Sequence, residues 1–163
     1  MPHKKERVGR EALIPNPGLA GFTPFIGTWA TVGHHPMVQG VTFHGRSTFD
    51  WHEGGAFVVM RTEIDESEIP SGIAIFGSDD SAETLSMIYF DERKVARRYE
   101  AALQLGVLRW WRNTPGFSQR FTATLAGDGN TMEGVGEMSK DSGPWAPDLA
   151  LFYTRIGGSS QSP

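Results

Sequence analysis

Short runs rich in Val, Ile, Thr, Phe, Tyr and Trp recur along most of the 163-residue chain, with turn-forming residues between them. These residue types are enriched in β-strands, and the short, even spacing of the runs is typical of an all-β domain. We expect ten strands, over residues 25–33, 44–52, 55–65, 71–78, 82–91, 95–102, 105–112, 116–126, 129–139 and 147–155. Strands joined by such short links are antiparallel neighbours.

The links carry turn chemistry, as in Glu53-Gly54-Gly55 and Gly127-Asp128-Gly129. Links of this size leave no room for crossover helices, which excludes βαβ folds and favours a sandwich or a barrel. A closed barrel has no exposed strand edge, and ten strands enclose more room than the eight that just hold one small ligand. The sequence therefore predicts an all-β, antiparallel up-and-down β-barrel of about ten strands.

The two ends of the chain differ in composition from this strand-rich middle. Ile14-Pro15-Asn16-Pro17-Gly18 cannot form regular helix or central strand, because the prolines fix φ and remove donors. We expect a flexible N-terminal arm over residues 1–18 and a barrel domain over 19–156. Residues 157–163 have the composition of a disordered tail, and a short plug over one end of the barrel is expected within residues 12–24.

Composition and charge exclude several classes of function. The chain has no cysteine, which excludes disulfides, thiolate catalysis and cysteine-ligated metal sites. Its net charge is −4 and its one basic run lies within residues 3–10, so we expect no nucleic-acid partner. No secretory h-region follows the N-terminus and no apolar run is long enough to span a membrane, so we expect no membrane partner and a cytoplasmic location.

Both ends of the predicted barrel carry a recognisable signature. Gly27-Thr28-Trp29 in the first strand and Arg155 in the last resemble the pattern of the calycin group, which includes the lipocalins. An arginine plane over an indole face combines packing with cation–π attraction and can close one end of a barrel. The resemblance implies a lipocalin-like fold in which Gly27, Trp29 and Arg155 have structural roles.

The last strand adds two narrower resemblances. Its approach, Ser139-Lys140-Asp141-Ser142-Gly143-Pro144-Trp145, with the ending Tyr153-Thr154-Arg155, is similar to an uncharacterised bacterial family of calycin-like domains of unknown function. The chain also resembles the nitrobindins, ten-stranded barrels in which a histidine of the last strand ligates haem. Here Asp148 stands at that position, and a carboxylate is a poor sole axial ligand. Haem or nitric-oxide binding is therefore a disfavoured alternative, and the cofactor stays unknown.

A histidine-based metal site is also disfavoured. His44 and His52 lie at opposite ends of one expected strand, more than about 20 Å apart at ~3.3 Å per residue. His34 and His35 precede Pro36 in an expected loop, where paired histidines are usually solvated. We predict no metal site.

Arginine side chains are better candidates for ligand binding. Side chains alternate between the two faces of a strand, so one of Arg97 and Arg98 points into the barrel. The face with Arg97 and Tyr99 is the more apolar one, and we assign both residues to the ligand site. In Arg109-Trp110-Trp111-Arg112 we assign Arg109 and Trp111, although alternation alone does not decide which tryptophan points inward.

Apolar positions on alternating strands complete the candidate pocket. Met60 and Met87 are assigned to it because methionine lines adaptable pockets well, and Phe90, Phe121 and Met138 share the pattern. An inward arginine beside aromatic rings suits an apolar ligand with an anionic head. The alternative is that the arginines pair with outward carboxylates such as Glu63, Asp65 and Glu100.

The favoured function is a binding barrel for a small apolar or amphipathic molecule, acting as carrier, sensor or sequestering protein. The alternative from another class is a cofactor-independent enzyme in the barrel cavity, with Tyr99, Glu63 and Asp65 as acid–base groups. No catalytic residue is assigned, because no compelling acid–base pair is present. A homodimer is possible, and the sequence does not decide it.

Overall fold

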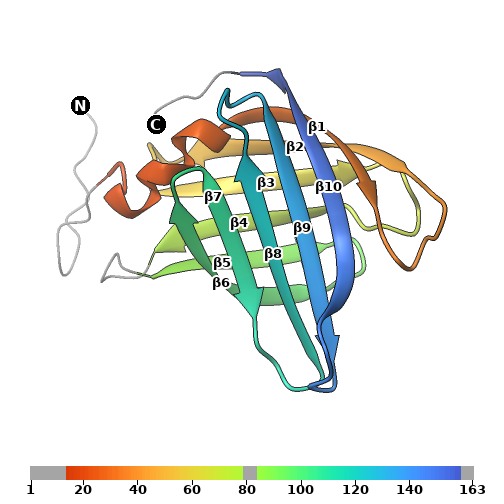
Figure 1. The fold of residues 1–163 in the computed structure, drawn as a ribbon. Helices are drawn as coiled ribbons and strands as arrows, with labels where there is room; N and C mark the ends of the chain where they lie inside the picture. Colours follow the sequence, from red (N-terminus) through yellow and green to blue (C-terminus); the bar gives the residue numbers. More distant parts are fainter. Residues whose placement is uncertain (1–13, 79–83, 159–163) are drawn as a thin grey trace.

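The protein forms a closed antiparallel β-barrel of ten strands in the computed structural model, which describes residues 14–78 and 84–158 (Figure 1). Each strand pairs with its neighbours in sequence, and β1 pairs with β10 to close the sheet. The strands are β1 Gly27–His34, β2 Phe43–His52, β3 Phe57–Ile64, β4 Gly72–Ser78, β5 Leu85–Asp91, β6 Ala96–Gln104, β7 Val107–Arg112, β8 Phe117–Leu125, β9 Thr131–Lys140 and β10 Ala146–Gly157. The predicted fold class and strand order are confirmed.

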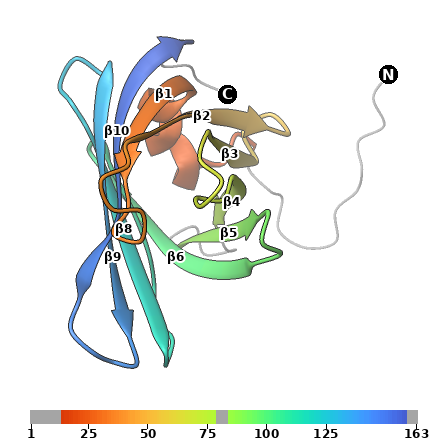
Figure 2. The same cartoon turned by 90° about the vertical axis from the view of Figure 1, so that its right-hand side faces the viewer.

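A 3₁₀ helix, η1, precedes the barrel over Pro17–Phe25 and plugs one end of it (Figures 1 and 2). Asn16 caps the helix through its side chain, which accepts from the Gly18 N–H, and the Asn16 N–H donates to Gly55 O. Within the expected arm over residues 1–18, Asn16 is the N-cap of η1 and Pro17 is its first residue, a position to which proline is well suited.

The remaining terminal predictions concern mostly residues that the structure does not describe. The arm over residues 1–13, the tail over 159–163 and the expected start of the fifth strand at residues 82 and 83 lie outside the described residues. Gly157, which had been placed in the tail, is the last residue of β10 and pairs with Thr28. Within the described ranges, no helix is long and apolar enough to cross a membrane.

The signature residues meet where β1, β10 and η1 come together. The guanidinium of Arg155 lies over the Trp29 ring at 4.2 Å, and it donates to Ile26 O and Pro24 O at 2.7 Å each. Gly27 has a φ of +131°, and a Cβ at this position would lie 2.7 Å from Arg155 Nη1. Only glycine fits here, which gives a physical reason for the Gly27, Trp29 and Arg155 pattern.

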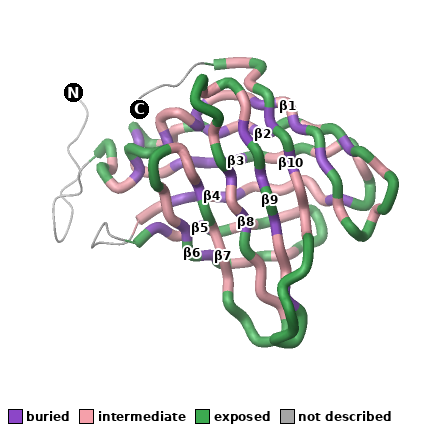
Figure 3. The backbone as a smooth tube through the Cα atoms, in the orientation of Figure 1, coloured by how far each residue is buried: buried purple, intermediate pink, exposed green. Residues whose placement is uncertain are grey.

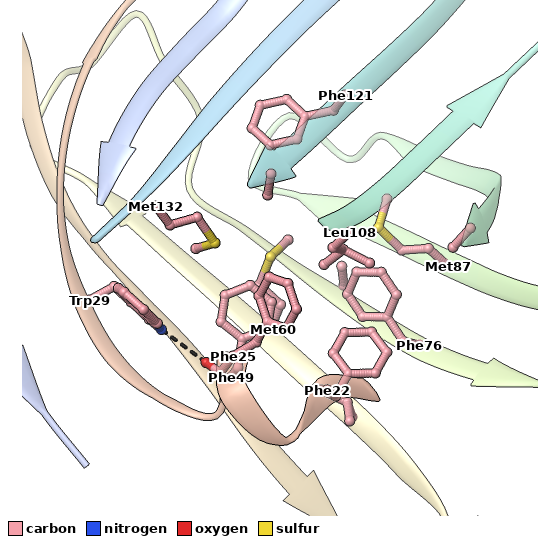
Figure 4. Close-up of a cluster of buried hydrophobic side chains, with 14 of the residues drawn as sticks. Phe22, Phe25, Trp29, Phe49, Met60, Phe76, Met87, Leu108, Phe121 and Met132 are labelled. Carbon is pink, nitrogen blue, oxygen red and sulfur yellow. Dashed lines mark hydrogen bonds between the residues drawn. The ribbon is translucent and has the colours of Figure 1, made fainter. Parts of the chain in front are cut away.

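Fully buried aromatic side chains make up the core beside η1. Burial alternates along the strands, as expected when one face of each strand points into the barrel (Figure 3). Phe22 and Phe25 of η1 are fully buried and pack against Phe76 and Phe49 of the wall (Figure 4). Trp29 donates from its Nε1 to Phe25 O at 2.9 Å, so its polar atom is satisfied. This end of the barrel is therefore filled.

Candidate ligand-binding cavity

The barrel interior contains a cavity of about 370 Å³. Its wall includes residues of the loops after β1, β3 and β5, which lie at the opposite end of the barrel from η1. This volume is within the range of small-molecule sites. The residues that line it include Met37, Met60, Met87, Met138, Trp110, Phe117, Phe121, Leu149, Leu151, Tyr89, Tyr99, Tyr153, Arg97, Gln119, His35 and Asp148.

The inner part of the cavity is apolar and aromatic. Trp110 stacks on Phe121 with ring centroids 4.5 Å apart and an interplanar angle of 15°. Met60 and Met87, both assigned to the site from the sequence, lie in the same wall and are buried (Figure 4). Methionine and aromatic side chains together form a surface that adapts to an apolar body.

A connected set of polar side chains lies in the wall of the outer part. Gln119 Oε1 accepts from the Tyr99 hydroxyl at 2.7 Å and from Arg97 Nη1 at 3.1 Å. Its amide donates from Nε2 to Asp148 Oδ2 at 3.0 Å. The amide group of Gln119 is thereby fixed between a cation and a carboxylate. We call Arg97, Tyr99, Gln119 and Asp148 the polar cluster.

Arg97 has donor capacity that the protein does not use. Guanidinium carries five N–H donors, and among the described residues Arg97 makes one side-chain hydrogen bond, to a neutral amide. The other two arginines of the wall are paired with carboxylates, Arg93 with Asp91 and Arg120 with Glu137. In the described part of the chain no carboxylate lies within 4 Å of Arg97, so its charge is open to an anionic ligand.

The Tyr99 hydroxyl is a proton donor at neutral pH. Burial raises its pKa, although the nearby Arg97 and Arg112 act in the opposite direction. A neutral phenol donates to Gln119 and holds that amide in place. The ring of Tyr99 also packs edge-on against Tyr89, with centroids 6.5 Å apart. Tyr99 therefore positions the polar cluster and lines the cavity.

Tyr89 and its partners form a second polar group at the rim. The Tyr89 hydroxyl donates to Asp91 Oδ2 at 2.8 Å, and Arg93 Nη2 lies 2.6 Å from the same oxygen. Burial, followed by the contact with Asp91, raises the pKa of Tyr89. The pKa of Asp91 is lowered: desolvation acts to raise it, but the hydrogen bonds from Arg93 and Tyr89 outweigh that effect. Because Asp91 already accepts hydrogen bonds from Tyr89 and Arg93, its carboxylate does not compete with an anionic ligand for Arg97.

His35 differs from the sequence-based expectation of a solvated loop histidine. Its side chain is only 14% exposed, and its Nε2 lies 2.7 Å from Asp148 Oδ1. The Met37 N–H points at Nδ1 from 3.1 Å, and since a backbone N–H can only donate, Nδ1 accepts and Nε2 donates to Asp148. This pair ties the loop after β1 to β10 at the cavity mouth. His35 is thus held by the half-buried carboxylate of Asp148 and not by water, because a hydrogen bond to a carboxylate is stronger than one to a neutral acceptor.

The residues present do not fit a histidine-ligated haem. Asp148 takes the position of the histidine expected from the nitrobindin resemblance, and both of its carboxylate oxygens accept hydrogen bonds. His35, the one histidine in the cavity wall, uses both ring nitrogens and offers no free lone pair. Among the described residues, no group of three or more His, Asp or Glu side chains is arranged to hold a metal ion.

Two residues assigned to the site from the sequence lie outside the cavity wall. Arg109 is exposed on the outer face of β7, and Trp111 is also absent from the lining. Alternation places their neighbour Trp110 inward, opposite Phe121 across the β7–β8 pair. The same rule corrects Phe90, which is 46% exposed on the outer face of β5.

The carboxylates named for the enzyme alternative are also elsewhere. Glu63 and Asp65 are exposed and do not line the cavity. The carboxylate that belongs to the polar cluster is Asp148. Asp148, Gln119 and His35 all line the cavity, and the sequence assigned none of them to the site. Gln119 could have been found, since it is two residues from Phe121 and so on the same face of β8. Nothing in the sequence indicates the contact between His35 and Asp148, which lie 113 residues apart.

Comparison with known proteins supports the fold and adds no activity. No family model matches the chain, and no curated protein matches its sequence. Among solved structures, the crystal structure of Rv2717c from M. tuberculosis is similar, with a TM-score of 0.63. The match covers 86% of this chain and 98% of that chain at 13% sequence identity. At this identity the likeness shows a shared barrel fold alone.

Proposed function

We propose that the protein is a binding barrel for a small amphipathic molecule with an apolar body and an anionic head. The observation that carries the proposal is Arg97, a half-buried cation at the cavity wall. Among the described residues its side chain contacts the Phe117 ring and donates one hydrogen bond, to a neutral amide, and it faces no carboxylate within 4 Å. A carboxylate or similar anion that enters the cavity gains a charge-assisted hydrogen bond there. Carrier, sensor and sequestering roles all use such a site.

The apolar inner wall supports the other half of the proposal. Met60, Met87, Trp110, Phe121 and Leu151 surround a space that suits an aliphatic or aromatic body. Each methylene group removed from water there contributes about 0.8 kcal/mol. An amphipathic molecule therefore gains from both parts of the cavity at once, whereas a purely polar anion gains from one.

The calycin-like group and the cytoplasmic location that the sequence indicates are part of the same proposal, and the enzyme alternative is weighed with them. The stacking of Arg155 on Trp29 supports placement among calycin-like barrels. The lack of cysteine is compatible with a cytoplasmic location. A cavity enzyme has weaker support than a binding protein, because Glu63 and Asp65 lie outside the cavity.

The test compares decanoate with decanol by isothermal titration calorimetry, using wild-type protein, Arg97→Gln and Arg98→Gln. Arg98 is exposed on the same strand, so its variant makes the same charge change outside the cavity. Arg97→Gln should weaken decanoate binding about ten- to hundred-fold, since a hydrogen bond to a charged group contributes about 1.5–3 kcal/mol. Decanol binding should not change in either variant.

Two results would contradict the proposal. One is the absence of decanoate binding to folded wild-type protein at millimolar concentration. The other is an equal loss of decanoate affinity in Arg97→Gln and Arg98→Gln, which would show that net charge and not the cavity arginine attracts the anion.

A further inference from the structure

Tyr153 of β10 is a buried tyrosine whose hydroxyl has no hydrogen-bond partner among the residues that the structure describes. Its side chain is 3% exposed, and it lines the cavity. Within residues 14–78 and 84–158 no hydrogen bond to this hydroxyl is present, while its ring packs edge-on against Trp29 at 6.5 Å. A phenylalanine would supply the same packing against Trp29, so the packing alone does not require this hydroxyl.

The position of Tyr153 separates it from the polar cluster. Tyr153 lies five positions after Asp148 on β10, a distance of roughly 16 Å at ~3.3 Å per residue. Tyr153 stands beside Trp29 and is therefore at the plug end of the cavity. The wall between the two levels is apolar and includes Leu149 and Leu151. The cavity thus has one polar group of residues near its mouth and one hydroxyl at its inner end.

Thr31 is the register partner of Tyr153 on β1, and a comparison of the two hydroxyl groups shows what distinguishes that of Tyr153. Thr31 Oγ1 also lacks a partner among the described residues, but it is sealed from the cavity. A ligand cannot reach that oxygen without a rearrangement. Tyr153 is the residue of this pair that lines the open space.

The chemistry of the hydroxyl defines what it can bind. Burial raises the pKa of Tyr153, and no neighbouring charge contributes to the shift, so the phenol is neutral and can donate. A charged ligand group at this depth would lose its hydration without gaining a counter-ion. A neutral acceptor oxygen, such as a ketone, ester or hydroxyl oxygen, has the matching chemistry.

We propose that Tyr153 forms a second, inner polar subsite, and that the ligand class is an amphipathic acid bearing a neutral oxygen far from its anionic head. This inference rests on the proposed function, since it places the head at Arg97. The two subsites together discriminate oxygenated chains from plain ones. The apolar wall between them holds the intervening carbon chain.

The test uses pairs of linear acids that differ by one carbonyl. Octanoate, decanoate and dodecanoate are each compared by calorimetry with the acid of the same length that carries a ketone next to its terminal methyl group. At the best-fitting length, wild-type protein should bind the oxo-acid about ten-fold more tightly, which corresponds to one net hydrogen bond. In Tyr153→Phe the preference should vanish, while the affinity for the plain acid stays within about two-fold.

The outcomes separate the two proposals. If plain acids bind in an Arg97-dependent manner but no oxo-acid of any length is preferred, the inner subsite is wrong and the proposed function stands. A preference that persists in Tyr153→Phe also overturns the subsite, because another group must then recognise the ketone. If neither acid binds in an Arg97-dependent manner, the proposed function itself fails. Thermal unfolding of Tyr153→Phe should show an unchanged or higher midpoint, which confirms that the variant folds.

Discussion

The two ends of the barrel use their cations in opposite ways. At the plug end, Arg155 donates to the backbone carbonyls of Pro24, Ile26 and Gly129 and covers the Trp29 ring. At the mouth, Arg97 makes one hydrogen bond to a side-chain amide. All three nitrogens of the Arg155 guanidinium donate to backbone oxygens, whereas only one nitrogen of Arg97 donates to a described residue.

This difference separates stability from binding. Around the plug, Phe22, Phe25 and Trp29 are fully buried, and the tryptophan Nε1 is satisfied by the backbone. In the mouth, the polar cluster lies in the wall of a cavity, where its groups can exchange partners when a ligand enters. Substitutions at the plug should therefore reduce the free energy of unfolding, whereas those at the mouth should mainly reduce affinity.

The largest expected effect is at Trp29. Trp29→Ala should lower the free energy of unfolding by about 3–5 kcal/mol, because it leaves a cavity beside the plug and frees the carbonyl of Phe25. Urea denaturation measures this change. Trp145→Ala is the matched control, since Trp145 is 37% exposed and lies over Arg120 outside the core. An equal loss in the two variants would show that the plug is not the stabilising end.

A smaller effect is expected at Tyr99. Tyr99→Phe removes the donor to Gln119 and should lower the free energy of unfolding by about 1 kcal/mol, as for one hydrogen bond. Decanoate affinity should fall about three-fold, because Gln119 is then held less firmly beside Arg97. Tyr153→Phe serves as the comparison, since the Tyr153 hydroxyl makes no hydrogen bond to the described part of the chain. If Tyr153→Phe is the more destabilising of the two, the account of both hydroxyls is wrong.

The fold could be predicted from the sequence because its signals are local. Alternating β-branched and aromatic residues mark each strand, and short turn-rich links leave antiparallel pairing as the simplest arrangement. The prediction that Gly27, Trp29 and Arg155 close the barrel rests on a family resemblance. The structure gives the physical reason for the glycine, because Arg155 approaches Gly27 closely. The plug expected within residues 12–24 corresponds to η1, which begins at Pro17 because proline is well suited to a helix start.

The candidate site was only partly predictable. Arg97 and Tyr99 could be placed in the wall because the apolar character of their neighbours distinguishes the two faces of β6. In β7 both faces carry one Arg and one Trp, so the pattern does not decide between Trp110 and Trp111. The contact of His35 with Asp148 depends on closure of the barrel, which brings distant segments together after the strands are set.

The most direct test of the central claim is a crystal structure of the protein with decanoate bound. The account predicts a carbon chain along Met60, Trp110 and Phe121, with the carboxylate within hydrogen-bond distance of the Arg97 guanidinium. The account would be contradicted by a carboxylate bound at the exposed Arg109. It would also be contradicted by a cavity without decanoate under conditions where calorimetry shows saturation.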